Sequence, residues 1–410
     1  MAKNYASLFN SVLDSSALNQ TVYVKKESVN GQMIAPTGDD FMFVLAGGGQ
    51  NFTQPLESSA HRSGRHNNNT IKKKKSLDWS YPTYINIDTQ AAAGDDEIES
   101  GISTLWESVL GYKLSDVTGV YYDSRNDPSI TMTIFEIGDY WAKQAYGCFA
   151  DSAEVQLVGD GESQINWSGF GVESFMVGIS QSTVDNNGGN TVTVATDHGK
   201  RFPVGSMVQI VLADGVTRST DTPDGAPRKV LSVAGDVVTL DGAVLADADG
   251  LAAEIYLTYY EPEAPVGIDN PQTGLVGDFI STSMPSNICR NATISIANNH
   301  EPVNYNFGTD ALSGSLFVPA SRLEVSVSVE VNMSKENMGL YNDIQAFIPQ
   351  DLEFNLGDSA GRHLNIKAPR VEFGVPSVSV PESGSIPFTL EGMAYQTVFD
   401  AADEIQIKYK

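Results

Sequence analysis

The residues from Arg322 to Met333, RLEVSVSVEVNM, alternate between apolar and polar side chains along their whole length. A period of two places all the apolar residues on one face of an extended strand and all the polar residues on the other. The apolar set is Leu323, Val325, Val327, Val329 and Val331, and the polar set is Glu324, Ser326, Ser328, Glu330 and Asn332. The segment predicts a long antiparallel strand with one buried face and one wet face.

Shorter segments of the same kind recur along the chain between turns rich in glycine, of which the sequence has 37. Strands are predicted at 81–87, 131–137, 153–158 and 163–171. Residues 101–112 instead have apolar side chains at helical spacing, and so do residues 334–349, where Ser334 can cap the start and Pro349 ends the pattern. We therefore predict a mainly β protein, a β-sandwich with one or two flanking helices.

Residues 183–261 differ in character from their surroundings. The glycine- and asparagine-rich VDNNGGN opens the segment, short β-branched strands follow at close intervals, and EPEAPVGIDNPQTG closes it. We predict an inserted small β-barrel or sandwich domain over 183–261, with 1–182 and 262–410 as the N-terminal and C-terminal parts of one main domain. The inserted domain is expected to fold separately and to be dispensable for assembly.

The chain has 25 Lys and Arg against 51 Asp and Glu, a formal charge of -26. This balance argues against a general nucleic-acid-binding surface, which needs clustered cations. One segment, residues 62–75, departs from it with six cations and no acid: Arg62, Arg65, Lys72, Lys73, Lys74 and Lys75. The segment is either a solvated loop or, in a self-assembling acidic protein, an arm that reaches a neighbouring copy.

Motifs of catalysis and metal binding do not occur in the sequence. The five histidines are scattered, the triple glycine at 47–49 is followed by no Lys-Ser/Thr, and Cys148 and Cys289 fit no metal spacing. We expect two idle thiols, no cofactor, no metal and no enzymatic activity. No apolar run approaches the length of a membrane span, so we also expect no membrane insertion.

Several long segments resemble the tail tube proteins of long-tailed bacteriophages. In the C-terminal part they are CRNATISIANNHEPVNYNFG, LSGSLFVPASRLEVSVSVEVNM and NIKAPRVEFGVPSVSVPESGSIPFTLEGMAYQ. In the N-terminal part they are GQMIAPTGDDFMFVLAGGG, ISTLWESVLGY and MTIFEIGDYWAKQAYGCFADSAEVQLVGDGESQINWSGFG. The resemblance covers about 1–182 and 262–410 and leaves the inserted domain unmatched.

This resemblance implies a structural protein of a siphophage virion, assembled in the host cytoplasm. Six copies, each giving four strands, would close into a hexameric ring, and stacked rings would form a tube that conducts genomic DNA without binding it specifically. Other implied partners are a tape-measure protein, the tail terminator and the tail tip proteins. Because the tube interior must not hold DNA, the wet faces of two strands are expected to line it, through Glu324, Ser326, Ser328, Glu330, Asn332, Glu154 and Gln156.

In the same scheme the cations of residues 62–75 stack ring on ring and become ordered on assembly, and the inserted domain decorates the outside of a non-contractile tube. An alternative is an adhesin-like or carbohydrate-binding β-sandwich protein of a virion or cell surface, with Tyr256, Tyr259 and Tyr260 as the binding platform. A third class, a polysaccharide-degrading enzyme, has no supporting set of residues.

Overall fold

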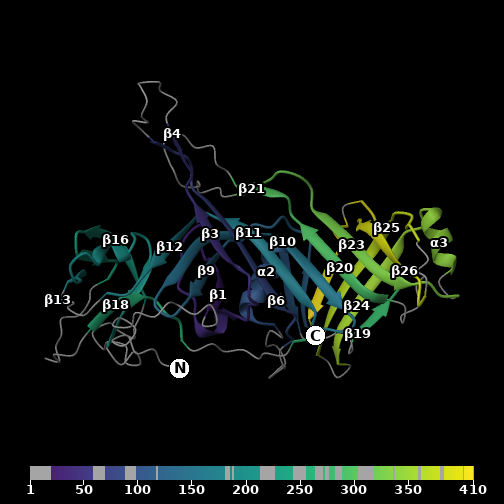
Figure 1. Ribbon diagram of the computed structural model, residues 1–410, viewed down its shortest axis with the longest axis horizontal. Helices are drawn as coiled ribbons and strands as arrows, with labels where there is room; N and C mark the ends of the chain where they lie inside the picture. Colours follow the sequence, from purple (N-terminus) through teal and green to yellow (C-terminus); the bar gives the residue numbers. More distant parts are fainter. Residues whose placement is uncertain are drawn as a thin grey trace.

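Strands dominate the computed structural model, which confirms the prediction of a mainly β protein. The described residues are 20–58, 70–87, 98–116, 119–180, 185–186, 189–212, 227–242, 255–263, 271–272, 277–281, 289–302, 317–335, 338–358, 362–378, 383–399 and 401–409. Within them, 17 strands belong to one antiparallel network that closes around a common core. Figure 1 shows an elongated molecule, with the inserted strands β13, β16 and β18 at one end and α3 at the other.

The strand network contains the same arrangement twice. The first set, which we call unit 1, comprises β1 (Thr21–Lys26), β3 (Gly49–Thr53), β6 (Ser76–Tyr84), β9 (Met132–Ile137), β10 (Ala142–Val158), β11 (Gln164–Gly171) and β12 (Glu173–Val177). The second set, unit 2, comprises β19 (Gly277–Ile280), β20 (Cys289–Ala297), β23 (Glu324–Asn332), β24 (Gln350–Asp358), β25 (Arg362–Phe373), β26 (Pro387–Ala394) and β27 (Gln406–Tyr409).

The pairing order is the same in both units. The front layer runs β3-β6-β11-β10 in unit 1 and β20-β23-β26-β25 in unit 2. The back layer runs β1-β9-β10-β12 in unit 1 and β19-β24-β25-β27 in unit 2. The long strands β10 and β25 each pass from the back layer into the front layer. Residues 1–182 and 262–410, predicted as two parts of one domain, thus each contain a whole unit: unit 1 lies in the first segment and unit 2 in the second.

The connections repeat as well. A hairpin follows the first front strand of each unit, formed by β4 (Leu56–Ser58) with β5 (Thr70–Lys72) and by β21 (His300–Pro302) with β22 (Phe317–Pro319). A helix follows the second front strand of each unit: α2 (Ser100–Leu110) and α3 (Met338–Gln345). Unit 1 alone adds β2 (Phe41–Met42), β7 (Tyr112–Asp116) and β8 (Gly119–Asp123), and β8 pairs with β27 of unit 2.

The two units share one continuous front sheet because β10 pairs with β20 from Ser152↔Ala297 to Val158↔Asn291. The front sheet therefore has eight strands in the order β3-β6-β11-β10-β20-β23-β26-β25. Six copies that each give four strands to a channel wall were expected; the chain offers eight strands in one sheet because it holds two units.

Helix α2 lies inside the molecule: nine of its eleven residues are buried, including Ser103, Thr104 and Ser108. Trp106 packs edge-on against Trp167 of β11 at 4.7 Å, and its indole N–H donates a hydrogen bond of 3.0 Å to the Tyr409 hydroxyl. The helix ends at Gly111, whose left-handed φ of 83° lets its N–H bond the Glu107 carbonyl. Both predicted helices occur, the second over fewer residues than its pattern covers.

The inserted segment forms its own six-stranded sheet in the order β13-β14-β17-β16-β15-β18. Its strands are β13 (Asp185–Asn186), β14 (Thr191–Thr193), β15 (Met207–Leu212), β16 (Arg228–Ala234), β17 (Val237–Leu240) and β18 (Ile255–Tyr259). The apolar core beneath this sheet continues into unit 1, through Tyr23, Phe135, Ile137 and Val177. The inserted sheet thus has a strand ladder of its own, while its packing and hydrogen bonds such as that from Tyr259 N–H to the Gly178 carbonyl join it to unit 1.

Candidate functional site

The outer face of the front sheet is a broad polar surface, which we call the polar face. It is built by the alternation seen in the sequence: in β23 the four valines are buried and the residues between them are partly exposed. Strand register aligns such residues in rows across the sheet. One row is Gln164, Gln156, Thr293, Ser328 and Glu391, and the next is Asn166, Glu154, Ser295, Ser326 and Met393.

The predicted lumen residues thus meet on one surface although they come from strands far apart in sequence. Glu154 and Gln156 of β10 lie across β20 from Ser326 and Ser328 of β23. Their shared face follows from register, because paired residues in an antiparallel sheet point the same way.

The charges of the polar face are mostly negative. Register and alternation place six carboxylates of its strands on this face: Asp78, Glu154, Glu324, Glu330, Glu372 and Glu391. Among the described strand residues, the two cations of this face are each paired with an acid: Arg290 Nη1 lies 3.1 Å from Glu330 Oε1, and Arg370 Nη2 lies 2.6 Å from Glu372 Oε1. Glu330 also accepts a 2.9 Å hydrogen bond from Asn291 Nδ2. Glu330 is therefore partly neutralised, whereas Glu324 and Glu391 are exposed.

The outward face of the back layer has a different balance. On the described parts of β19, β24, β25 and β27 it presents Lys367 and Lys408 together with Asp278, Asp351 and Glu353. The excess of acids over cations is thus larger on the front sheet.

Asp78, Glu391, Gln164 and Asn166 belong to the polar face but were missing from the sequence prediction. The signal was available, since SLDWSYPTY and PFTLEGMA alternate as clearly as β23 over their central residues. What the sequence could not supply was the register, which decides that β6, β11 and β26 are neighbours of β10 and β23.

The described half of the basic segment belongs to a hairpin that projects from the body (Figure 1). Lys73 Nζ lies 2.8 Å from Glu57 Oε2, and Lys75 Nζ lies 2.5 Å from Glu173 Oε1. Residues 70–75 thus have defined structure in the single chain, so the expectation that they become ordered only on assembly is wrong. Arg62 and Arg65 lie outside the described residues. A role of this segment in stacking stays a prediction.

The residues proposed for carbohydrate binding are unsuited to it. Tyr256, Tyr259 and Tyr260 are buried, and the Tyr260 hydroxyl donates to the Pro36 carbonyl at 3.2 Å. They support the packing of the inserted sheet on unit 1 and offer no open platform.

Burial raises the pKa of Cys289 to about 12 and that of Cys148 well above its ordinary value, which leaves both thiols protonated at neutral pH. No group of three or more His, Cys, Asp or Glu side chains suited to a metal ion occurs among the described residues. None of the helices in the described part of the chain is long and apolar enough to cross a membrane.

Comparison with known proteins identifies no relative. No protein-family model matches the chain, and no curated protein matches it. The features of the molecule that indicate a function are therefore the polar face, the repeated units and the projecting hairpin.

Proposed function

We propose that the chain is the structural subunit of a phage tail tube, without catalytic activity, whose polar face lines the channel for genomic DNA. The observation that carries this proposal is the eight-stranded polar face, which is wide and acidic and on which the β21–β22 hairpin packs at Phe149 and Phe170. A monomeric β protein gains nothing from so large an open sheet, since its free edges favour aggregation.

Closure of the sheet into a ring would remove those edges. Among the described strands, β3 pairs only with β6, so its other side is open. At the opposite end of the sheet, residues 372 and 373 of β25 pair with β26 on one side only. Inside the chain, the last front strand of unit 1 pairs with the first front strand of unit 2. The same junction between copies would join β25 of one copy to β3 of the next.

The number of copies follows from the number of strands. Three chains of eight strands give 24 strands, which close into a barrel with a backbone diameter of about 48 Å when spaced about 4.8 Å and tilted roughly 40°. Six chains would give about twice that diameter by the same arithmetic. We therefore propose three chains per ring. Six units then surround the channel, which keeps the sixfold arrangement that the resemblance implies and replaces its six chains by three.

An acidic channel suits the passage of DNA. Duplex DNA carries closely spaced phosphates, and proteins hold it mainly through cations that neutralise them. A wall with six carboxylates and two arginines per chain, each arginine paired with one of those acids, offers DNA no such hold. In this proposal the tape-measure protein occupies the channel before ejection, and the terminator and tip proteins close the ends of a tube found in virions and assembled in the host cytoplasm.

Electron microscopy of the purified protein tests the proposal. Stacked rings or hollow tubes with three chains per ring are expected, and mass photometry of the smallest ring gives the chain count independently. Compact monomers at all concentrations, or particles without a central channel, would contradict it.

A further inference from the structure

The hairpin of unit 2 is seated on unit 1 within the same chain. The Phe317 ring lies 4.7 Å from the Phe149 ring and 5.0 Å from the Phe170 ring, measured between centroids. The His300 ring lies 4.9 Å from Phe149, and the His300 backbone N–H donates to Asp151 Oδ1 at 2.8 Å. The hairpin β21–β22 therefore reinforces the junction between β10 and β20.

The hairpin of unit 1, β4–β5, has the same construction. Each hairpin starts three residues after its first front strand ends, at Leu56 after β3 and at His300 after β20. Each then pairs over three positions, so that Leu56 corresponds to His300 and Thr70 corresponds to Phe317. Alternate residues of a strand share a face, so Leu56 and Thr70 lie on the docking face of β4–β5 and Ile71 on its opposite face.

The seat itself also has a counterpart in unit 2. A Cβ built on Gly169 would lie 1.9 Å from the Phe149 carbonyl oxygen, and one built on Gly392 would lie 2.6 Å from that of Glu372. Because both glycines approach a neighbouring carbonyl in this way, Gly169 of unit 1 corresponds to Gly392 of unit 2. By register, Glu372 then corresponds to Phe149 and Met393 to Phe170, and Tyr395 takes the place of Val172.

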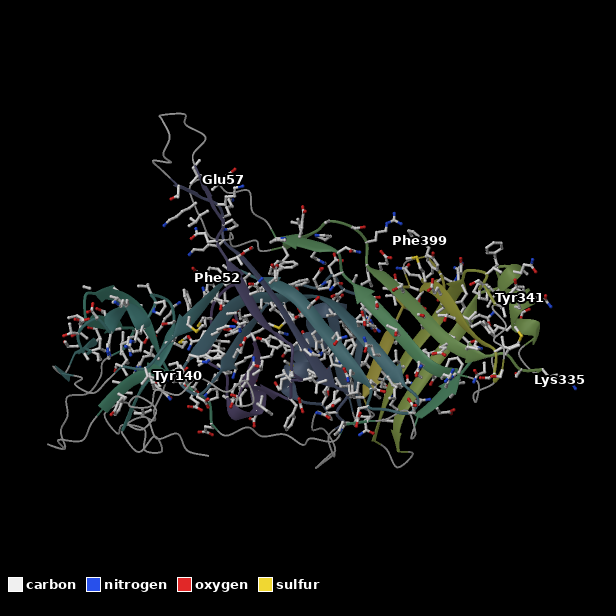
Figure 2. All side chains as sticks on the ribbon, in the orientation of Figure 1. Phe52, Glu57, Tyr140, Lys335, Tyr341 and Phe399 are labelled. Atoms are coloured by element: carbon white, nitrogen blue, oxygen red, sulfur yellow. The ribbon has the colours of Figure 1, made fainter. Side chains whose placement is uncertain are left out.

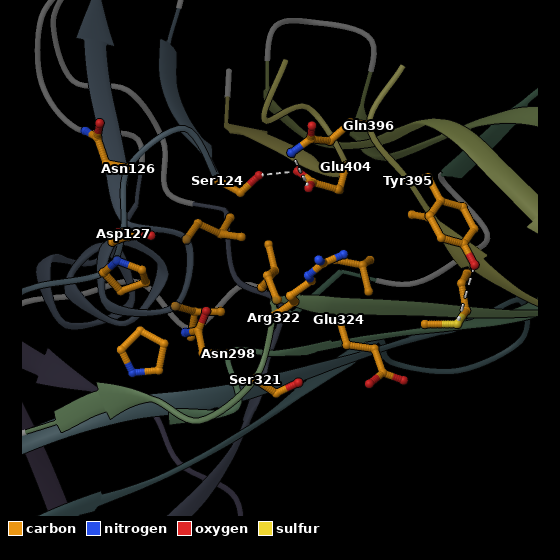
Figure 3. Close-up of a pocket in the computed structure, with 18 of the residues that line it drawn as sticks. Ser124, Asn126, Asp127, Asn298, Ser321, Arg322, Glu324, Tyr395, Gln396 and Glu404 are labelled. Atoms are coloured by element: carbon orange, nitrogen blue, oxygen red, sulfur yellow. Dashed lines mark hydrogen bonds between the residues drawn. The ribbon is translucent and has the colours of Figure 1, made fainter. Parts of the chain in front are cut away.

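These counterparts line an open cleft of about 1040 Å³ (Figure 3). Its rim carries exposed apolar side chains, with Val398 exposed to 67 % and Phe399 to 100 %. Figure 2 shows Phe399 at the edge of unit 2, and Glu57 far out on the hairpin of unit 1. Leu56, on the docking face of that hairpin, is exposed to 64 %. The unit 2 side of this cleft, which faces unit 1 residues such as Asn126 and Pro128, is thus an open seat. Unit 1 presents an exposed hairpin of the kind that fills its own seat.

The charges of the two surfaces are complementary. Acids outnumber arginines in the cleft, with Asp127, Glu324, Glu372 and Glu404 against Arg322 and Arg370. The docking face of the hairpin carries Lys72, which is exposed. A cation that enters this cleft would meet a net negative surface.

We propose that the β4–β5 hairpin of one copy docks into the cleft of the next copy in the same ring. The occupant is a second copy of this chain, and the inference rests on the proposed ring. It assigns Lys72 to contacts within a ring, whereas the stacking of rings then falls to the part of the basic segment outside the described residues, which holds Arg62 and Arg65.

A paired-cysteine experiment tests the contact. Thr70→Cys with Met393→Cys reproduces the Phe317 and Phe170 neighbours of the internal seat, so oxidation of assembled protein should convert most of the monomer band into a covalent ladder on a non-reducing gel. Thr70→Cys with Asn355→Cys, which places the second thiol on the back layer, is the matched control and should remain monomeric on the gel.

A second pair of variants uses the two faces of the hairpin. Leu56→Asp should raise the concentration needed for assembly by about tenfold or more, because it puts a charge where an apolar side chain is buried. Ile71→Asp changes a similarly exposed residue on the opposite face and should assemble like the original chain. Equal effects of the two changes would overturn the docking face.

The outcomes separate this inference from the proposed function. Original protein that forms rings, together with a Thr70 and Met393 pair that forms rings without cross-linking, overturns the docking and leaves the tube intact. Original protein that never forms rings overturns both.

Discussion

Glu27 is a buried carboxylate that ties together three separate parts of unit 1. It accepts hydrogen bonds from the backbone N–H groups of Gly31 and Gly147, both at 2.7 Å, and from the hydroxyls of Thr131 and Thr133. Its oxygens are therefore committed to structural donors, which is why a buried glutamate here is no sign of catalysis.

Glu27→Gln should destabilise the chain, because the amide NH₂ that replaces one oxygen cannot accept from its donors. The loss is expected to be about 3 kcal/mol of unfolding free energy, measured by urea denaturation. Glu162→Gln, at an exposed position, is the matched control and should unfold at the original urea concentration. Equal midpoints for both variants would contradict the role given to Glu27.

The exposed carboxylates of the polar face should control the passage of DNA. In virions whose tubes carry Glu391→Lys, ejection should be several-fold slower at low salt and should recover at high salt, because the lysines hold phosphates only while unscreened. Glu353→Lys, on the back layer, is the control and should leave ejection unchanged. Unaltered ejection in the first variant would count against the polar face as the channel wall.

His300, in the β21–β22 hairpin where it packs against Phe149, should make the free energy of unfolding depend on pH. Burial lowers its pKa below the ordinary 6.5, against a weaker opposite effect of Asp151. The unfolded chain then takes up a proton at higher pH than the folded chain, so folded stability falls as pH drops below about 6.5. The pKa of Asp151 is raised from 3.8 by burial, and this acts with the opposite sign nearer that lower pH.

His300→Phe should therefore weaken the fall in stability between pH 6.5 and 5.5, measured as the change in urea midpoint. The phenyl ring keeps the contact with Phe149 and cannot be protonated. Because His198 also has a pKa lowered by burial, some dependence should remain in the variant. An unchanged pH dependence would show that the seat does not sense protonation.

At the scale of elements, β11 in unit 1 and β26 in unit 2 each depend on a glycine where they pair with the long strand beside them. Gly169→Ala would force a methyl group against the Phe149 carbonyl and should cost about 2–3 kcal/mol of stability. Gly339→Ala in α3 meets nothing within 4 Å and should instead stabilise by up to about 1 kcal/mol, since alanine favours helix. Thermal unfolding of both variants checks the contrast, and a harmless Gly169→Ala would refute the close crossing.

Individual elements were predictable because their periodicity is local. The helix at 101–112, the strand at 322–333 and the separate strands of 183–261 all follow from spacing along the chain. The repeat was not predictable, because corresponding segments such as WSGFGV and LEGMAY share little beyond one glycine and the alternation. Likewise, the seat for the hairpin depends on strand register, and register is set by contacts between residues hundreds of positions apart.

At the scale of the whole molecule, the inserted sheet and unit 1 are fastened together. Gln144 makes two hydrogen bonds to the backbone of Met207, at 2.8 and 2.7 Å, and Tyr260 packs edge-on against Phe135. On the N-terminal side the connection is also held, since Ser180 N–H donates to the Leu257 carbonyl. Excision of 183–261 would uncover this packing. The structure therefore argues against the expectation, made from the sequence, that the inserted domain is dispensable.

The inserted sheet and unit 1 should therefore unfold in one transition in calorimetry, because they share a core. Gln144→Ala should lower the temperature of that single transition without splitting it. Two resolved transitions, with the inserted sheet melting alone, would instead support the separate domain. A chain lacking 183–261 should aggregate unless Tyr23 and Phe135 are also made polar.

The presence of two units in one polypeptide has a consequence for the kinetics of ring growth. Half of the junctions around a ring of three chains are formed during folding, at the very high effective concentration of tethered partners. Only two association events remain, because the third junction closes within the ring. The loss of translational and rotational freedom is therefore incurred twice, where six separate units would incur it five times. The two kinds of junction are also free to diverge in sequence: the covalently linked one can be strong from the start, while the other can stay weak until enough chains are present to close a ring.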